Sequence, residues 1–313
     1  MKAIILEKAG DVDNFQIKEI DQPSISAKEI LVETKALSVN PVDFKVRADQ
    51  GTMNMIYGED RPAILGWDIA GVIKEKGAKV TDFEVGDRVF GMVNFPGEGK
   101  AYAEYVAAPA SHLAKIPEGI SFEDAAASTL AALTAFQVLK GKVKTGDRVL
   151  IHAGSGGVGH FAVQIAKSMG AYAISTSSGS NRDFVLSLGA NQHVDYRKEK
   201  FEEMLSEIDF IFDMFNGEVL QKSVELVRKG GTVVSIPTPE FSEEVQKLAE
   251  EKDVSLQFHM VESSGADMEQ LAQLLKRGAL KPHISQIFTF EEMKEAHIQL
   301  ESGRTVGKVV VTL

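Results

Sequence analysis

The segment that most constrains how this chain folds is a glycine-rich turn between an apolar run and a helical pattern. Residues 148–159 read RVLIHAGSGGVG, which gives Gly154, Gly156 and Gly159 the G-x-G-x-x-G spacing. The chain has 27 glycines, so the spacing alone is weak. Its context is the one the motif requires, because a strand is expected over 148–153 and apolar residues at helical spacing predict a helix over 157–169. The segment therefore predicts a βαβ unit of a doubly wound parallel sheet.

Each glycine of this motif has a physical reason. The first permits the tight turn, the second lets the backbone approach a pyrophosphate, and the third lets helix and strand pack closely. The helix N-terminus then offers free N–H groups and the positive end of its dipole to phosphates. A strand–turn–helix connection without a ligand is the alternative. The predicted cofactor-binding residues of this loop are Gly154, Ser155, Gly156, Gly157, Val158 and Gly159.

The residues after the next expected strand, 171–177, indicate which dinucleotide is bound. NAD-binding units usually place Asp or Glu here to hold the ribose 2′-hydroxyl. Hydroxyl and guanidinium groups favour a 2′-phosphate, which a carboxylate repels. The sequence therefore predicts NADP(H). Alternatively Arg182 is a solvated residue at a helix start, and Asp183 beside it weakens the prediction. The predicted contacts are Ser177, Ser178, Asn181 and Arg182.

Outside this region, the pattern of expected secondary structure changes twice along the chain. The first ~120 residues show short β-branched runs separated by glycines, which is typical of a compact antiparallel domain, with a helix over 41–48. From Ser121, a helix-capping residue, expected strands and helices alternate, as an α/β fold with a parallel sheet requires. The last two expected strands, 283–288 and 307–313, are predicted to rejoin the N-terminal sheet. The predicted domains are 1–122, a nucleotide-binding insertion over 123–266, and a return over 267–313.

Composition excludes several classes of function. The 313 residues suffice for two domains, and the absence of cysteine excludes disulfides, thiolate zinc sites, iron–sulfur clusters and cysteine nucleophiles. A net charge of −11 disfavours a broad nucleic-acid footprint. No run approaches the ~18 apolar residues that span a bilayer, and the N-terminal residues MKAIILEK bring in charge before a signal-peptide apolar stretch could form. We expect a cytoplasmic protein with no nucleic-acid or membrane partner.

Several segments along the whole chain resemble the zinc-independent quinone oxidoreductases of the medium-chain dehydrogenase/reductase superfamily. The resemblance implies a Rossmann doubly wound parallel sheet plus a GroES-like β-rich catalytic domain completed by the C-terminal segment, with the active site in the cleft between them. The matching segments are 40–45 (NPVDFK), 66–71 (GWDIAG), 85–89 (VGDRV), 101–105 (AYAEY), 130–135 (LAALTA), the glycine loop, 228–236 (RKGGTVVSI) and 307–311 (GKVVV).

The resemblance also implies the reaction. Zinc-dependent members have Gly-His-Glu where this chain has Gly66-Trp67-Asp68, so no catalytic metal is expected. Hydride transfer from NADPH to a small-molecule quinone or α,β-unsaturated carbonyl is then the expected activity. Dimers are common among relatives, which makes a homodimer a candidate assembly. The alternative is an NADPH-binding redox sensor or structural protein with little catalysis.

On the substrate side, the resemblance implies roles for three residues. Asn40 would contact the nicotinamide, Lys45 its ribose or the substrate oxygen, and Tyr57 would line the substrate loop. Each also has a structural alternative, namely a helix cap for Asn40, a solvent-facing lysine for Lys45 and surface packing for Tyr57. His152, just before the glycine loop, is a further candidate for touching the cofactor.

On the cofactor side, the resemblance places Thr134 at the nicotinamide carboxamide and Tyr196 near the 2′-phosphate. A buried helix threonine and a strand-end aromatic are the alternatives. Ile236 and Pro237 are expected to pass the nicotinamide, because ligands bind beyond the carboxyl ends of such strands. Trp67 is either packed under the cofactor or a core residue, and the core is the simpler interpretation.

Overall fold

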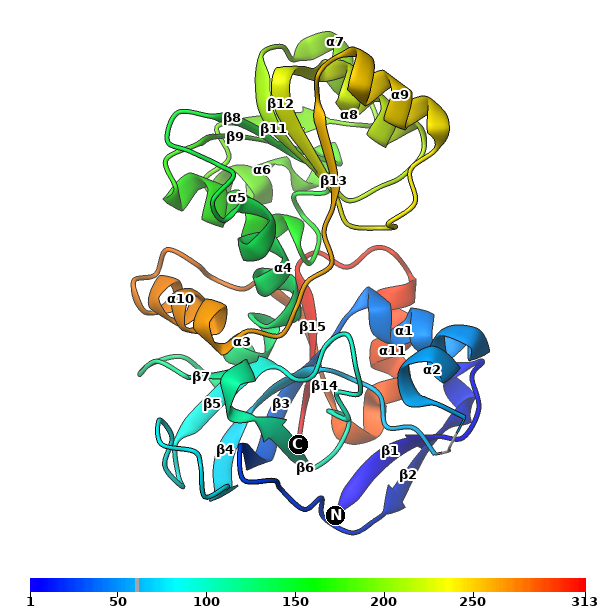
Figure 1. The fold of residues 1–313 in the computed structure, drawn as a ribbon, viewed down its shortest axis with the longest axis vertical. Coiled ribbons are helices and arrows are strands. Elements are labelled where there is room, and N and C mark those ends of the chain that lie inside the picture. The colour runs from blue at the N-terminus through cyan, green and yellow to red at the C-terminus, as the bar shows by residue number, and fades with distance from the viewer. Residues whose placement is uncertain (60–61) are drawn as a thin grey trace. The chain divides into compact units, whose positions relative to one another are not determined.

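The computed structural model describes residues 1–59 and 62–313. The chain forms two compact units, each built around its own sheet (Figure 1). Unit 1 comprises Met1–Leu133 and Val261–Leu313, and unit 2 comprises Thr134–Met260. Unit 1 is thus discontinuous in sequence, as the pattern of strands predicts.

Unit 2 contains a six-stranded, all-parallel sheet in the order β10-β9-β8-β11-β12-β13. The order runs outward in both directions from the neighbours β8 and β11, as in a doubly wound sheet, and confirms the predicted fold class. Leu150, Ile174, Ile211 and Val233, from four adjacent strands, are completely buried in its core. The strands are β8 (Arg148–Ile151), β9 (Tyr172–Ser177), β10 (Gln192–Asp195), β11 (Ile208–Asp213), β12 (Val227–Ser235) and β13 (Ser255–Phe258).

The helices of unit 2 follow the strands in alternation, as βαβ connections require. Their starts obey local capping rules; for example, Ser242 Oγ accepts a hydrogen bond from Val245 N (3.4 Å) ahead of a helix with two acidic residues in its first turn. These helices are α5 (Gly159–Ser168), α6 (Arg182–Ser187, preceded by the 3₁₀ turn η3, Gly179–Asn181), α7 (Phe201–Met204), α8 (Glu218–Leu226) and α9 (Glu243–Glu251).

Unit 1 contains a seven-stranded sheet in the order β14-β15-β3-β4-β5-β7, with β6 also paired to β3, and a separate β1-β2 ribbon. The C-terminal β15 pairs antiparallel with β3, with Val309 opposite Val39, so the C-terminal segment completes this sheet as predicted. Its strands are β1 (Lys2–Leu6), β2 (Phe15–Glu19), β3 (Glu29–Val39), β4 (Asp68–Lys76), β5 (Arg88–Met92), β6 (Tyr105–Pro109), β7 (Leu113–Lys115), β14 (Ile284–Thr289) and β15 (Lys308–Thr312).

The helices of unit 1 include one that the sequence pattern misses. The expected helix α1 (Pro41–Ala48) is followed by α2 (Gln50–Tyr57), where a loop was expected. Asp49 starts α2, because its carboxylate accepts a hydrogen bond from Thr52 N at 2.7 Å. The remaining helical segments of unit 1 are η1 (Val12–Asn14), η2 (Ala110–His112), α3 (Phe122–Ala127), α10 (Gly265–Lys276), η4 (Phe290–Glu292) and α11 (Met293–Glu301).

The Ser121 cap and the residues that follow it as far as Leu139 predict one continuous helix, but the structure has two helices here. Helix α3 ends at Ala127, and α4 (Leu130–Leu139) begins after Ser128 and Thr129. The new start is capped from far away in the sequence, since Asp68 Oδ1 accepts a hydrogen bond from Leu130 N at 3.0 Å.

The boundaries of the units lie elsewhere than the predicted 122/123 and 266/267. Helix α3 packs against β3, β4 and β15, so the chain stays in unit 1 until Leu133. The start of α10 packs against β7 and η2, so the chain returns to unit 1 at Val261. Both helices bury their apolar faces on the sheet of unit 1. This packing sets the boundaries of the unit, although the sequence pattern changes near Ser121.

Candidate functional site

The glycine loop lies between β8 and α5, at the carboxyl edge of the sheet of unit 2. A Cβ atom on Gly154 would lie 1.9 Å from Ser175 Oγ, and one on Gly159 would lie 2.1 Å from the carbonyl oxygen of Ala153. These two glycines are therefore required by packing inside the chain. A Cβ on Gly156 would be 3.2 Å from the same oxygen, which needs only a small shift. Gly156 is explained better by an approaching ligand than by the chain itself.

The loop presents its backbone to solvent in a conformation suited to phosphate. Ser155, Gly156, Gly157 and Val158 are partly exposed at the start of α5. Ala153, just before the loop, has a φ of 51°, a left-handed conformation that is uncommon outside glycine and clusters at functional sites. The free N–H groups of a helix start and the closely packed strand together fit the pyrophosphate of a dinucleotide.

The loop after β9 is tied to the glycine loop by a hydrogen bond from Asn181 Nδ2 to Ser155 Oγ (3.0 Å). Arg182, at the start of α6, is exposed. Ser178 is mostly buried, and its hydroxyl is bonded to that of Ser180 (2.9 Å), which is exposed and was missed in the sequence. The exposed polar groups of this loop are therefore those of Ser180 and Arg182.

The side chain of Ser177 points into the protein, whereas the sequence predicts that it contacts the phosphate. Its side chain is buried, and its hydroxyl hydrogen-bonds His193 Nε2 (2.8 Å) and the carbonyl of Ser178 (3.2 Å). Since the hydroxyl donates to that carbonyl, it accepts from the His193 N–H. Burial and the neighbouring Arg182 charge lower the pKa of His193, which keeps the ring neutral. Ser177 supports the loop from beneath.

The loop after β10 lies beside the loop after β9, because Asp195 pairs with Ser177 in the sheet. Tyr196 is 58% exposed, and Arg197 places its guanidinium 5.7 Å from the centre of the Tyr196 ring and donates from Nε to the Tyr196 hydroxyl (3.3 Å). Arg197 was missed in the sequence, although its place next to the predicted tyrosine is a signal. Among the described residues, neither Arg182 nor Arg197 forms an ion pair with a carboxylate.

Two further predicted residues, Ile236 and Pro237, directly follow β12 and are partly exposed at the same edge of the sheet. The residue that ends the neighbouring strand, Asp213, is completely buried. Its carboxylate accepts hydrogen bonds from Ser235 Oγ (2.7 Å) and Phe215 N (3.2 Å). Burial raises the pKa of Asp213 to about 7.

His152 is a core residue in this structure. Ser223 Oγ donates to the carbonyl of Val219 (2.8 Å), so it accepts from His152 Nε2 (3.0 Å), while His152 Nδ1 meets the Thr176 hydroxyl (3.1 Å). Burial lowers the pKa of His152 to about 4. The ring is thus neutral and has partners for both nitrogens. Thr134 is buried on α4, and its contact with a carboxamide remains a prediction.

The three substrate-side candidates lie in unit 1 and differ in exposure. Asn40 precedes α1 and is buried; its Nδ2 donates to Asp68 Oδ2 (2.7 Å), and its Oδ1 accepts from Lys308 Nζ. Lys45 is exposed on α1. Tyr57, the last residue of α2, is 6% exposed, and burial raises the pKa of its hydroxyl, for which no hydrogen-bond partner exists among the described residues.

A buried charge network surrounds Asn40. Asp43, Asp68 and Lys308 are each at most 3% exposed. Burial raises the pKa of Asp43 to about 8, an effect that the charge of Asp68 reinforces and the Asn40 amide and Lys308 oppose. Burial lowers the pKa of Lys308, and the two carboxylates counteract it. Asn40 therefore uses its side chain to hold β4 and β15 to the start of α1.

Trp67 occupies the position where zinc-dependent relatives have histidine. It is completely buried, donates from Nε1 to the Gly97 carbonyl (2.6 Å) and meets Phe95 edge-on at 5.3 Å, so it is a core residue. Within residues 1–59 and 62–313, no three His, Cys, Asp or Glu side chains are grouped to hold a metal ion. Over the same residues, no helix is both long enough and apolar enough to cross a bilayer.

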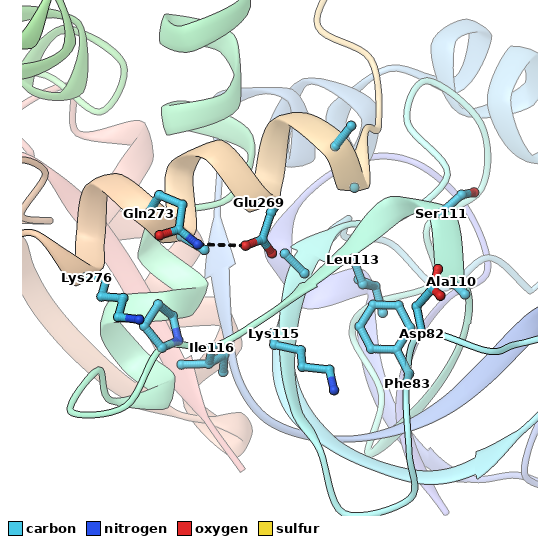
Figure 2. A pocket seen from close by; sticks show the side chains of 15 residues that line it. Asp82, Phe83, Ala110, Ser111, Leu113, Lys115, Ile116, Glu269, Gln273 and Lys276 are labelled. Atoms are coloured by element: carbon cyan, nitrogen blue, oxygen red, sulfur yellow. Dashed lines mark hydrogen bonds between the residues drawn. The ribbon is translucent and has the colours of Figure 1, made fainter.

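A groove of ≈ 560 Å³ in unit 1 contains none of the predicted site residues (Figure 2). It runs between α10 and the η2–β7 segment. Several of its polar groups bond to one another or to close neighbours, since Gln273 donates to Glu269 (2.8 Å) and Lys115 pairs with Asp87 (2.7 Å). Nothing in its lining converges on a ligand.

Comparison with known proteins shows the family. Residues 26–118 match the alcohol dehydrogenase GroES-like domain, and residues 188–311 match the zinc-binding dehydrogenase family. The chain is 32% identical to 2-methylene-furan-3-one reductase of Solanum lycopersicum and 31% identical to the chloroplastic NADPH-dependent alkenal/one oxidoreductase of Arabidopsis thaliana, in each case over 99% of this chain and 79% of the relative. The structure of the quinone oxidoreductase from Coxiella burnetii matches with a TM-score of 0.93 and 34% identity, covering 100% of this chain and 99% of that one. The chain therefore belongs to the medium-chain dehydrogenase/reductase superfamily and is an NAD(P)H-dependent oxidoreductase.

Proposed function

We propose that this protein reduces quinones or α,β-unsaturated carbonyl compounds with NADPH and without a catalytic metal. The observation that carries the cofactor choice is the pair of exposed guanidinium groups on the neighbouring loops after β9 and β10, namely that of Arg182 and that of Arg197, which donates to the Tyr196 hydroxyl. A 2′-phosphate is a dianion with three acceptor oxygens, and this donor set suits it. The names of the relatives, which include an NADPH-dependent alkenal/one oxidoreductase and a quinone oxidoreductase, support the substrate class.

The loops at the carboxyl edge of the unit 2 sheet suit one orientation of the dinucleotide. The glycine loop would hold the pyrophosphate, and the loops after β9 and β10 would hold the adenosine phosphate, with Ser178, Asn181, Arg182 and Tyr196 nearest. Ser177 would act through Ser178, since its own hydroxyl is turned inward. Ile236 and Pro237, at the end of β12, and Thr134 on α4 would face the nicotinamide end.

When bound, NADPH supplies a hydride to the conjugated carbon of the acceptor, whose carbonyl oxygen gains the displaced electron pair and then a proton from water. The protein's part is to orient the acceptor and stabilise that oxyanion. Lys45 is exposed and forms no ion pair among the described residues, so we assign it to the oxyanion. We assign Tyr57 as a second hydrogen-bond donor to the substrate. Asn40 holds the start of α1 in place and would contact the nicotinamide. Trp67 offers no metal ligand, which supports the metal-free reaction.

Coenzyme selectivity tests this proposal. We expect kcat/KM for NADPH to exceed that for NADH by at least about tenfold, because a charge-assisted phosphate contact contributes roughly 1.5–3 kcal/mol. Arg182→Ala is expected to remove most of this preference by lowering kcat/KM for NADPH alone. Arg277→Ala, which removes an exposed guanidinium from the residue directly after α10 in unit 1, is the matched control. Equal use of NADH by the wild-type protein would overturn the proposal.

A further inference from the structure

A row of polar side chains crosses the carboxyl ends of four neighbouring strands in unit 2, where β9, β8, β11 and β12 lie side by side (Figure 1). Thr176 of β9 hydrogen-bonds His152, the residue after β8. Since Phe212 pairs with Ile151, the next residues, Asp213 and His152, are adjacent, and Asp213 pairs with Ser235. The row therefore crosses from the β9 side of the sheet to the β12 side.

Asp213 is the charged member of this row, and within residues 1–59 and 62–313 it has no counter-ion. Its partners are a hydroxyl and a backbone amide, Ser235 Oγ and Phe215 N. The neighbouring His152 is neutral, and on α8 the ammonium of Lys222 is taken by Glu202 and Glu218. Across the described residues, no cation acts on the Asp213 carboxyl. A buried carboxylate without a counter-ion is costly, which is why its pKa lies near 7, and such groups cluster at functional sites.

The topology of the sheet indicates which part of the coenzyme lies near this carboxylate. The order of the parallel strands reverses between β8 and β11, and dinucleotides bind across such a switch point, outside the carboxyl ends of the strands. The glycine loop follows β8, and the proposed phosphate residues follow β9 and β10. The other half of the dinucleotide, which carries the nicotinamide, must then pass the ends of β11 and β12, where Asp213 and Ser235 lie.

We propose that the Asp213 carboxylate makes unit 2 bind the oxidised coenzyme more tightly, relative to the reduced one, than it otherwise would. The oxidised nicotinamide carries a positive charge and the reduced ring is neutral, so a nearby buried anion favours the oxidised form. The same charge favours hydride release, because the ring becomes cationic as the hydride leaves. This inference rests on the proposed function for the identity of the coenzyme.

The ratio of the dissociation constants for NADP⁺ and NADPH tests this role without turnover. Both forms carry the same adenosine phosphate, so titration of His193 or of the phosphate cancels in the ratio. For the wild-type protein we expect the ratio to fall roughly tenfold between about pH 5.5 and about pH 8.5, as Asp213 ionises. Asp213→Asn, which keeps the shape of the side chain, should give a ratio that does not vary with pH and equals the wild-type value at low pH.

Ser235→Ala provides a second variant that leaves the carboxyl in place. It removes a hydrogen bond that favours the ionised form, so the fall in the ratio should move to higher pH while keeping its size. A wild-type ratio that is constant over this range, or an Asp213→Asn variant with the wild-type profile, would overturn the inference. Preference for NADH would instead overturn the proposed coenzyme, and the same ratio for NAD⁺ and NADH would then test Asp213 on its own.

Discussion

The two units surround their buried carboxylates with different partners. In unit 1, burial raises the pKa of Asp68, and the buried charge of Lys308 and hydrogen bonds from Asn40 Nδ2 and Leu130 N oppose this rise. In unit 2, Asp213 is equally buried but meets only a hydroxyl and one amide among the described residues. A buried charge with a counter-ion holds chain segments in position. A buried charge without one creates an electrostatic potential that favours a ligand of the opposite charge. The difference indicates that unit 1 uses its buried charge for its own fold and that unit 2 holds polar groups in place for a ligand.

The largest expected effect is that of removing the cation from unit 1. Lys308→Met leaves Asp68 and Asp43 buried without a counter-ion, so we expect the free energy of unfolding to fall by about 3–5 kcal/mol. Urea-induced unfolding measures it. Lys294→Met, which breaks the exposed pair with Asp13, is the control and should change stability by less than ~1 kcal/mol. Equal effects of the two substitutions would show that Lys308 does not stabilise the buried carboxylates of unit 1.

A pH-dependent change of stability in Asp213→Asn is the next largest effect. The folded carboxyl has a pKa of about 7 and the unfolded one about 4, so between these values the folded protein binds more protons and becomes less stable as pH rises. Asparagine does not titrate. The stability of the variant relative to wild type should therefore increase by about 3.5 kcal/mol from pH 4 to pH 8, since a shift of one pKa unit corresponds to about 1.4 kcal/mol. A difference that does not change with pH would show that the folded Asp213 carboxyl does not titrate near pH 7 and would contradict the absence of a counter-ion around it.

Substitution of the second glycine tests whether the loop of unit 2 serves a ligand. Gly156→Ala places a methyl where the chain itself nearly has room, so we expect the NADPH dissociation constant to rise at least about tenfold with less than ~1 kcal/mol lost in stability. Gly159→Ala, whose Cβ would clash with the Ala153 carbonyl, should lower both the affinity for NADPH and the free energy of unfolding. Fluorescence titration and urea unfolding measure the two quantities. Loss of stability without loss of affinity in Gly156→Ala would contradict a ligand role.

The smallest expected effect on stability concerns Tyr57. Its buried hydroxyl has no partner among the described residues, so Tyr57→Phe should leave the free energy of unfolding within about 0.5 kcal/mol of wild type or raise it slightly. If the hydroxyl instead serves the substrate, kcat falls while stability is retained. A variant destabilised by more than about 1 kcal/mol would mean that the hydroxyl supports the fold of unit 1.

The sequence predicts what depends on local pattern. The glycine loop, the Ser121 cap and the strand that pairs Val309 with Val39 follow from spacing, capping chemistry and β-branched runs. What it misses depends on partners that are distant along the chain. The break before Leu130 requires Asp68, and the side chain of Asn40 is held by Asp68 and by Lys308, 268 residues away. Likewise, only the assembled sheet reveals that Asp213 has no counter-ion in the part of the chain that the structure describes.

The central claim is that NADPH bound to unit 2 reduces a conjugated carbonyl compound. Its most direct test is the rate of loss of NADPH absorbance with the full-length protein at saturating coenzyme, over a panel of ortho-quinones, para-quinones and enones. We predict that at least one acceptor accelerates NADPH loss and that chelator treatment leaves the rate unchanged. NADPH that binds while no acceptor in the panel accelerates its oxidation would contradict the claim and would favour a coenzyme-binding sensor or structural protein.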